Sequence, residues 1–142
     1  MRKRLKRAGM LPAHLLWHQG RGLVKKTPAL VEEKLSDKKC VPCEGGISPF
    51  SLEDLFVYQK QVHEDWRVAD EGKKIKRDVT FKDFKEAMEF VNKVADVAEA
   101  EGHHPDITIS YNNVVISLWT HAIGGLSEND FIMAAKIDCI SL

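Results

Sequence analysis

The chain has 142 residues, of which 44% are apolar and 30% are charged, proportions typical of one globular domain with a single core. No apolar run approaches the ~18 residues that a membrane-spanning helix needs, so no membrane association is expected. Lysine and arginine together number 21, as do aspartate and glutamate, so the net charge at neutral pH is zero.

The charge is distributed unevenly along the chain. Residues 1–31 carry +8 and contain no acid, whereas residues 32–142, with 13 basic and 21 acidic side chains, carry −8. A basic, acid-free leader is typical of an organelle transit peptide, and the absence of serine favours a mitochondrial one. A plastid or cytoplasmic location, with the leader as a basic tail, is the alternative. Direct nucleic-acid binding is not expected, because the acidic body would oppose it.

Three cysteines, Cys40, Cys43 and Cys139, are too few and too odd in number for a secreted disulfide scaffold. Cys40 and Cys43 have C-x-x-C spacing, but a single pair supplies only half of a usual zinc site. The glycine-rich stretch 45–49 is typical of a boundary. We therefore expect a leader and flexible lead-in over 1–46, with reduced cysteines, and a folded domain over 47–142.

Apolar periodicity and capping residues predict seven elements in this domain. In chain order they are a helix over 51–63, strands over 66–68 and 74–81, a helix over 82–100, strands over 107–111 and 114–119, and a helix over 128–138. Each helix follows a hydroxyl with an acid three residues later, at Ser51–Asp54, Thr80–Asp83 and Ser127–Asp130. The order α-β-β-α-β-β-α predicts an α+β fold, a four-stranded antiparallel sheet with helices packed on one face.

Three of the six histidines flank the second predicted hairpin. If the turn is centred on Asn112–Asn113, paired residues have numbers that sum to about 225, which places His104 opposite His121. His103 lies beside this pair. The register therefore predicts that three imidazoles meet at one end of the hairpin.

Imidazoles titrate near neutral pH, so one can donate a proton while another accepts one. A zinc site is the competing interpretation, with Asp130 as a possible fourth ligand. Because His103 and His104 are adjacent in extended chain, their side chains point to opposite faces, and no metal is expected. Polar capping of strand ends is a third interpretation.

The spacing of these residues resembles the signature of the pterin-4a-carbinolamine dehydratases. That signature combines an acid, a His-His-Pro motif, an aromatic residue, a histidine and an aspartate. It is matched here by Glu99, His103-His104-Pro105, Tyr111, His121 and Asp130. The resemblance extends over about residues 47–140.

The resemblance implies dehydration of 4a-hydroxytetrahydropterin to quinonoid dihydropterin, a step in tetrahydrobiopterin recycling that needs no metal or organic cofactor. It implies that His103 and His121 are the acid–base residues and that His104 orients the pterin. Further residues have weaker implied roles beside structural alternatives. They are Glu99 (partner of an imidazole or solvated acid), Asp130 (partner of an imidazole or helix cap), Thr120 (bond to the pterin ring) and Trp66 (pocket wall or core).

Family members also serve as binding proteins, which implies an alternative for this chain. It is a non-catalytic role in transcription-factor dimerisation or Rubisco assembly. The intact histidines favour catalysis over a pure scaffold. The resemblance further implies a homodimer or homotetramer.

Overall fold

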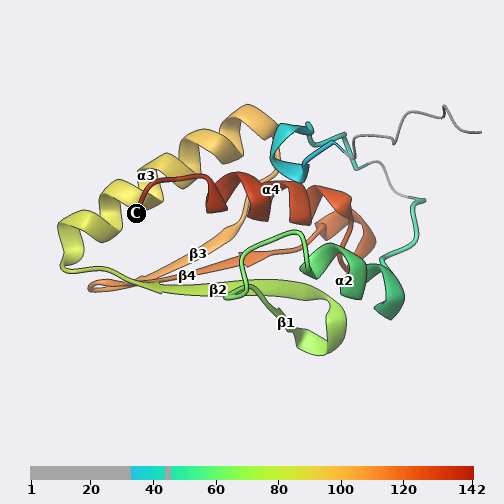
Figure 1. The fold of residues 1–142 in the computed structure, drawn as a ribbon, viewed down its shortest axis with the longest axis horizontal. Coiled ribbons are helices and arrows are strands. Elements are labelled where there is room, and N and C mark those ends of the chain that lie inside the picture. The colour runs from blue at the N-terminus through green and yellow to red at the C-terminus, as the bar shows by residue number, and fades with distance from the viewer. Residues whose placement is uncertain (1–32, 44–45) are drawn as a thin grey trace, which may run out of the picture. The chain divides into compact units, whose positions relative to one another are not determined.

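A four-stranded antiparallel sheet forms the centre of the fold in the computed structural model, which describes residues 33–43 and 46–142 (Figure 1). The strands follow the order β1-β2-β4-β3 across the sheet. Their bounds are β1 Arg67–Ala69, β2 Lys74–Thr80, β3 Asp106–Ser110 and β4 Asn113–Leu118. The proposed targeting leader lies almost wholly outside the described residues.

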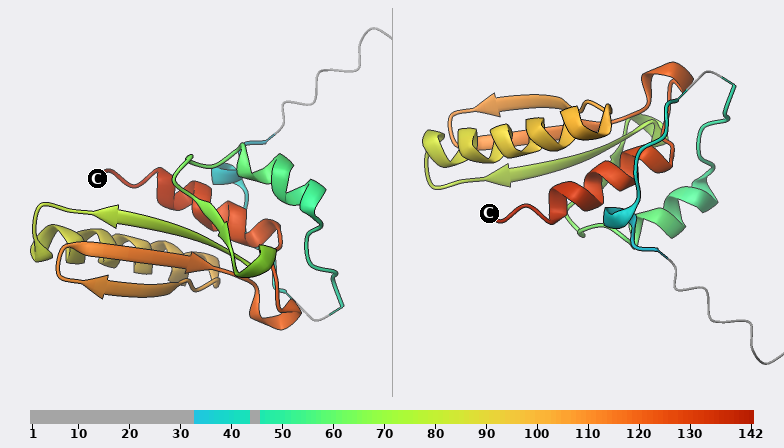
Figure 2. Two further views of the ribbon diagram at one scale, coloured as in Figure 1. Left: turned by 90° about the horizontal axis from the view of Figure 1, so that it is seen from below. Right: turned by 90° about the horizontal axis from the view of Figure 1, so that it is seen from above.

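In the described part of the chain, three α-helices accompany the sheet, α2 (Leu52–Gln59), α3 (Phe84–Glu101) and α4 (Glu128–Asp138). Figure 1 and the views from below and from above in Figure 2 place α3 and α4 side by side on the same face of the sheet. The predicted α+β class and element order are therefore confirmed. The described residues also form short 3-10 turns, η1 (Leu35–Asp37), η2 (Asp70–Gly72) and η3 (His121–Ile123). No described helix is both long and apolar enough to cross a membrane.

The observed helix ends agree with the predicted ones for α4 and at the end of α3, and they differ at the start of α3 and the end of α2. The bounds of α4 are those predicted, and α3 ends where Gly102 adopts a left-handed conformation with φ 66°. The predicted Thr80 cap is wrong, because Thr80 closes β2 and the side chain of Asp83 caps α3 instead. The first helix ends at Gln59 rather than His63, and the Gln59 side chain then bonds the Trp66 carbonyl oxygen.

The second hairpin is shifted by one residue from the prediction. Ser110 pairs with Asn113, so Tyr111 and Asn112 form the turn, and Tyr111 takes the positive φ of 51°. The backbone carbonyl and side chain of Asn112 both bond the backbone of Phe81, at 2.8 and 2.7 Å. These bonds fix Asn112 in the turn. The predicted pairing of His104 with His121 is therefore wrong as a strand register.

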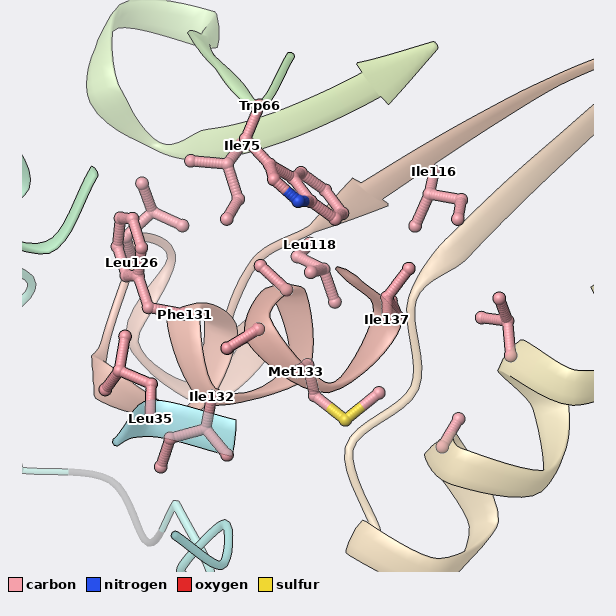
Figure 3. Close-up of a cluster of buried hydrophobic side chains, with 14 of the residues drawn as sticks. Leu35, Trp66, Ile75, Ile116, Leu118, Leu126, Phe131, Ile132, Met133 and Ile137 are labelled. Atoms are coloured by element: carbon pink, nitrogen blue, oxygen red, sulfur yellow. The ribbon is translucent and has the colours of Figure 1, made fainter. Parts of the chain in front are cut away.

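Large apolar side chains from the sheet and α4 form the core (Figure 3). Its fully buried members include Trp66, Ile75, Ile116, Leu118 and Phe131. Leu35 of the lead-in joins this core and is only 3% exposed. One compact unit extends over Glu33–Leu142 and thus includes part of the lead-in, which buries an apolar side chain of its own.

Candidate active site

The three histidines of the hairpin line one cavity of about 430 Å³, despite the shifted register. His103 and His104 enter it directly after α3, and His121 enters it from the first residue of η3. The chain reaches η3 because Thr120 pairs with Gly125 in an isolated bridge, with its N–H 2.8 Å from the Gly125 carbonyl oxygen. The Thr120–Gly125 bridge, which lies beyond the paired residues of β3 and β4, therefore brings His121 to the other two histidines, a role that the sequence had assigned to the hairpin register.

His103 is held by a buried carboxylate. Its Nε2 lies 2.6 Å from Oδ1 of Asp130, a residue with no solvent exposure. The other oxygen, Oδ2, accepts hydrogen bonds from the Ser127 N–H at 2.9 Å and the Thr120 hydroxyl at 2.8 Å. Asp130 thus serves both interpretations considered for it, since it completes the Ser127 capping box and also orients an imidazole. No described residue bonds Nδ1 of His103.

His104 has a carboxylate partner of a different kind. Its Nε2 lies 2.6 Å from Oε1 of Glu99, but the side chains of both residues are well exposed. An exposed ion pair of this kind contributes little to stability. The contact instead limits the positions that the His104 ring adopts at the edge of the cavity.

His121 makes a ring stack rather than an ion pair. Its imidazole lies on the Trp119 indole with ring centroids 3.8 Å apart and an interplanar angle of 28°. The indole is fixed in turn, because its Nε1 donates a hydrogen bond of 2.9 Å to Asp106 Oδ2. No described residue bonds the ring nitrogens of His121. The ring is therefore oriented by stacking, while its nitrogens remain available to a bound molecule.

Two further predicted site residues, Thr120 and Trp66, are buried, and their polar groups bond other side chains of the protein. The Thr120 side chain is buried, and its hydroxyl is engaged with Asp130 and with Ser127 Oγ at 2.8 Å. Trp66 is fully buried, and its Nε1 donates a hydrogen bond of 2.9 Å to Asp138 Oδ1. The structure therefore favours the core alternative for Trp66, which does not line the histidine cavity.

The lead-in supplies a wall of the cavity that the sequence analysis missed. Residues 40–43 line the cavity together with the histidines. Burial, reinforced by the nearby Glu101 carboxylate, raises the pKa of Cys40 to about 12, so this thiol is protonated at neutral pH. The interpretation of these cysteines as part of a flexible segment is wrong, because Cys40 N–H bonds Glu101 Oε2 at 2.9 Å and Val41 bonds Asn129.

The donor set of the cavity suits proton transfer. Among the described residues, no group of three or more His, Cys, Asp and Glu side chains is arranged to hold a metal ion. Two imidazoles have carboxylate partners, and the third has none in the described part of the chain. Such a set can give a proton to one atom of a bound molecule and remove a proton from another.

Comparison with known proteins agrees with the resemblance seen in the sequence. The family model described as "Pterin 4 alpha carbinolamine dehydratase" matches residues 49–140. A protein of Rickettsia bellii named "Putative pterin-4-alpha-carbinolamine dehydratase" is 46% identical over 106 residues, which cover 75% of this chain and 93% of that protein. A protein of the same name from Nitrosomonas eutropha is 48% identical over 106 residues, 75% of this chain and 92% of its own.

A solved structure shares the fold. It is described as a transcriptional coactivator/pterin dehydratase from Brucella melitensis and superposes with a TM-score of 0.60 at 31% identity. The match covers 63% of this chain and 95% of that chain.

Proposed function

The chain belongs to the pterin-4a-carbinolamine dehydratase family, and from this premise we propose that it dehydrates a 4a-hydroxytetrahydropterin to the quinonoid dihydropterin. The observation that supports the proposal is the arrangement of the cavity. Three imidazoles line it, and the nitrogens of His121 have no partner among the described residues. Acid–base chemistry needs such groups, whereas a pure binding surface does not.

The reaction requires two proton transfers. The C4a–O bond breaks and the hydroxyl leaves as water, which requires a proton from an acid. The adjacent ring nitrogen forms a C=N bond to C4a and loses its own proton to a base. We assign the acid and the base to His103 and His121, and the orientation of the pterin to His104. The products are water and the quinonoid dihydropterin, so no electrons are gained or lost.

Asp130 supports this chemistry by holding His103, without touching the pterin itself. Because its carboxylate bonds Nε2 of His103, it fixes which nitrogen faces the cavity. Trp119 has the corresponding role for His121, since the stack fixes the plane of the ring. Both are positioning residues, because the reacting atoms would meet the imidazoles alone.

The proposal is tested by the rate at which freshly generated 4a-hydroxytetrahydrobiopterin loses water, followed by ultraviolet absorbance. His103→Ala and His121→Ala should each lower the enzymatic acceleration by roughly 10²–10⁴-fold. His63→Ala is the matched control, because His63 lies in the loop before β1 and outside the cavity. No acceleration by a folded wild-type protein would reject the proposal and favour the non-catalytic binding role.

Two further parts of the proposal concern the setting of the enzyme. We propose a mitochondrial location because the leader carries +8 and no acid. Fusion of residues 1–35 to a fluorescent protein tests this location, with a diffuse cytosolic signal as the contrary result.

We also propose a homo-oligomer, because β1 and β3 leave two open sheet edges. A monomeric mass by light scattering would reject that assembly.

A further inference from the structure

The cavity has a second wall, which the lead-in forms. The match to the family model begins at residue 49, and Cys40, Val41, Pro42 and Cys43, which precede it, line the same cavity as the three histidines. The two walls come from segments about 60 to 80 residues apart in the sequence. Their meeting therefore needs specific contacts that hold the lead-in in place.

Asn129 provides the main contact with this wall. Its Oδ1 accepts the Val41 N–H at 3.0 Å, and its Nδ2 donates to the Val41 carbonyl oxygen at 2.6 Å. Nδ2 also lies 3.0 Å from Cys43 Sγ, and the backbone carbonyl oxygen accepts from Cys40 Sγ at 3.6 Å. Asn129 is only 3% exposed. The buried Asn129 side chain thus fixes both polar groups of the Val41 backbone, and the residue contacts both thiols, Cys43 through its amide and Cys40 through its backbone carbonyl.

A second set of contacts anchors the chain just before Val41. Glu101 accepts the Cys40 N–H through Oε2 and forms an ion pair of 3.0 Å with Lys136 through Oε1. Lys136 also donates to the Ser36 carbonyl oxygen at 3.1 Å, and Lys38 pairs with Glu128. The wall is therefore anchored to the end of α3 and to one side of α4.

Asn129 is adjacent to Asp130 in the first turn of α4. Asp130 fixes His103, and Asn129 fixes Val41, so one helical turn sets the distance between the wall and an imidazole. The wall offers the apolar side chains of Val41 and Pro42 and a neutral thiol, Cys40. Such a surface suits the face of a flat, uncharged heterocycle better than a charged ligand.

We propose that residues 40–43 form a substrate-contacting wall that sets affinity for the pterin ring, with Val41 as a specificity residue and Asn129 as its positioning residue. This inference rests on the proposed dehydratase function and assigns to it a part of the chain that precedes the match to the family model. The wall acts in binding, and the imidazoles perform the proton transfers.

Val41→Asp tests the wall without disturbing its backbone bonds, because the Val41 residue is 62% exposed. The carboxylate should raise KM for the hydroxypterin and the Kd for unreactive 7,8-dihydrobiopterin by about tenfold, with kcat within about twofold. Val57→Asp is the matched control, a valine on α2 that is 56% exposed and outside the cavity. It should match the wild type in all three constants.

Asn129→Ala tests the positioning role and should also raise KM and Kd while kcat changes less. Circular dichroism establishes that each variant is folded. An active wild type whose KM and Kd are unchanged in folded Val41→Asp would overturn this inference alone. A folded wild type that neither binds 7,8-dihydrobiopterin nor dehydrates the hydroxypterin would overturn the proposed function and this inference together.

Discussion

The imidazole of His103 is joined to Asp130, with Nε2 and Oδ1 only 2.6 Å apart, and the carboxylate is sealed from solvent. The same carboxylate caps α4 through Ser127 and accepts the Thr120 hydroxyl. The start of α4, the segment that follows β4 and an imidazole are thus all bonded to the two oxygen atoms of one carboxylate. Orientation of the imidazole is therefore coupled to the packing of α4.

This relationship predicts the effect of Asp130→Asn. The amide keeps the shape of the side chain, but it replaces one carboxylate oxygen with an NH₂ donor. Whichever oxygen is replaced, the new donor faces a group that donates to the carboxylate in the wild type, either His103 or the Ser127 N–H and the Thr120 hydroxyl. We expect kcat to fall by roughly 10²-fold, because the His103 ring loses its fixed orientation. We also expect the free energy of unfolding to fall by about 1–3 kcal/mol, because a buried donor is left unpaired. Steady-state kinetics and urea unfolding measure the two effects.

Asp65→Asn is the control for Asp130→Asn, because Asp65 is exposed, lies 3.4 Å from His63 Nδ1 through Oδ2 and does not line the histidine cavity. It should leave kcat unchanged. If Asp130→Asn lost stability but retained the wild-type kcat, Asp130 would be a helix cap without a role in orienting His103.

Trp66→Phe separates the core from the site. The substitution removes the indole N–H that bonds Asp138 Oδ1, the oxygen that also accepts from Arg77 at 2.6 Å. We expect a loss of about 1–3 kcal/mol in the free energy of unfolding, from the lost bond and a small cavity. The KM for the pterin should not change, because Trp66 is fully buried in the core. A raised KM in the folded variant would instead favour the interpretation of Trp66 as part of the pocket wall.

Sequence periodicity predicted the elements that are amphipathic and local. The stripe after Asp83 and the left-handed Gly102 give α3, and the capping box at Ser127 gives α4 with its observed bounds. The hairpin register was off because Tyr111, rather than an asparagine, takes the positive φ. That choice depends on bonds between Asn112 and Phe81, 31 residues away, which no local pattern records.

The candidate site was likewise predicted where the signal is local in the sequence and missed where it depends on distant contacts. The spacing of His103, His104 and His121 predicted a cluster, and the structure brings all three to one cavity. The wall was missed because its contacts join Val41 to Asn129 across 88 residues. The C-x-x-C pair was the available signal, but its spacing alone was interpreted as a feature of flexible chain.

Glu101 makes the anchoring of the wall dependent on pH. Burial alone would raise the pKa of Glu101, but bonds from the Cys40 N–H and Lys136 outweigh burial and lower this pKa below its ordinary value of 4.5. A carboxyl with a lowered pKa in the folded state stabilises the protein above the pKa of the unfolded state. That stabilisation is lost as the pH falls from about 4.5 through the lower folded value.

Glu101→Gln should therefore melt at a lower temperature than the wild type at pH 7, and the difference should shrink as the pH falls below 4.5. Thermal melts at pH 7, 5 and 3.5 measure this difference. Glu89→Gln is the control, an exposed residue on the same helix, and its melting temperature should follow the wild type at every pH. A difference for Glu101→Gln that is constant with pH would show that its charge does not anchor the wall.

The thiols of the chain should differ in reactivity. The pKa of Cys40 is about 12, so at pH 8 only about one Cys40 thiol in 10⁴ is the reactive thiolate. Cys139 is exposed at the end of α4. Iodoacetamide at pH 8 should therefore modify Cys139 first, and Cys40 should react at a comparable rate only after unfolding in urea. Peptide mass spectrometry over a time course identifies the order, and early modification of Cys40 in the native protein would mean that residues 40–43 detach from Asn129 in solution.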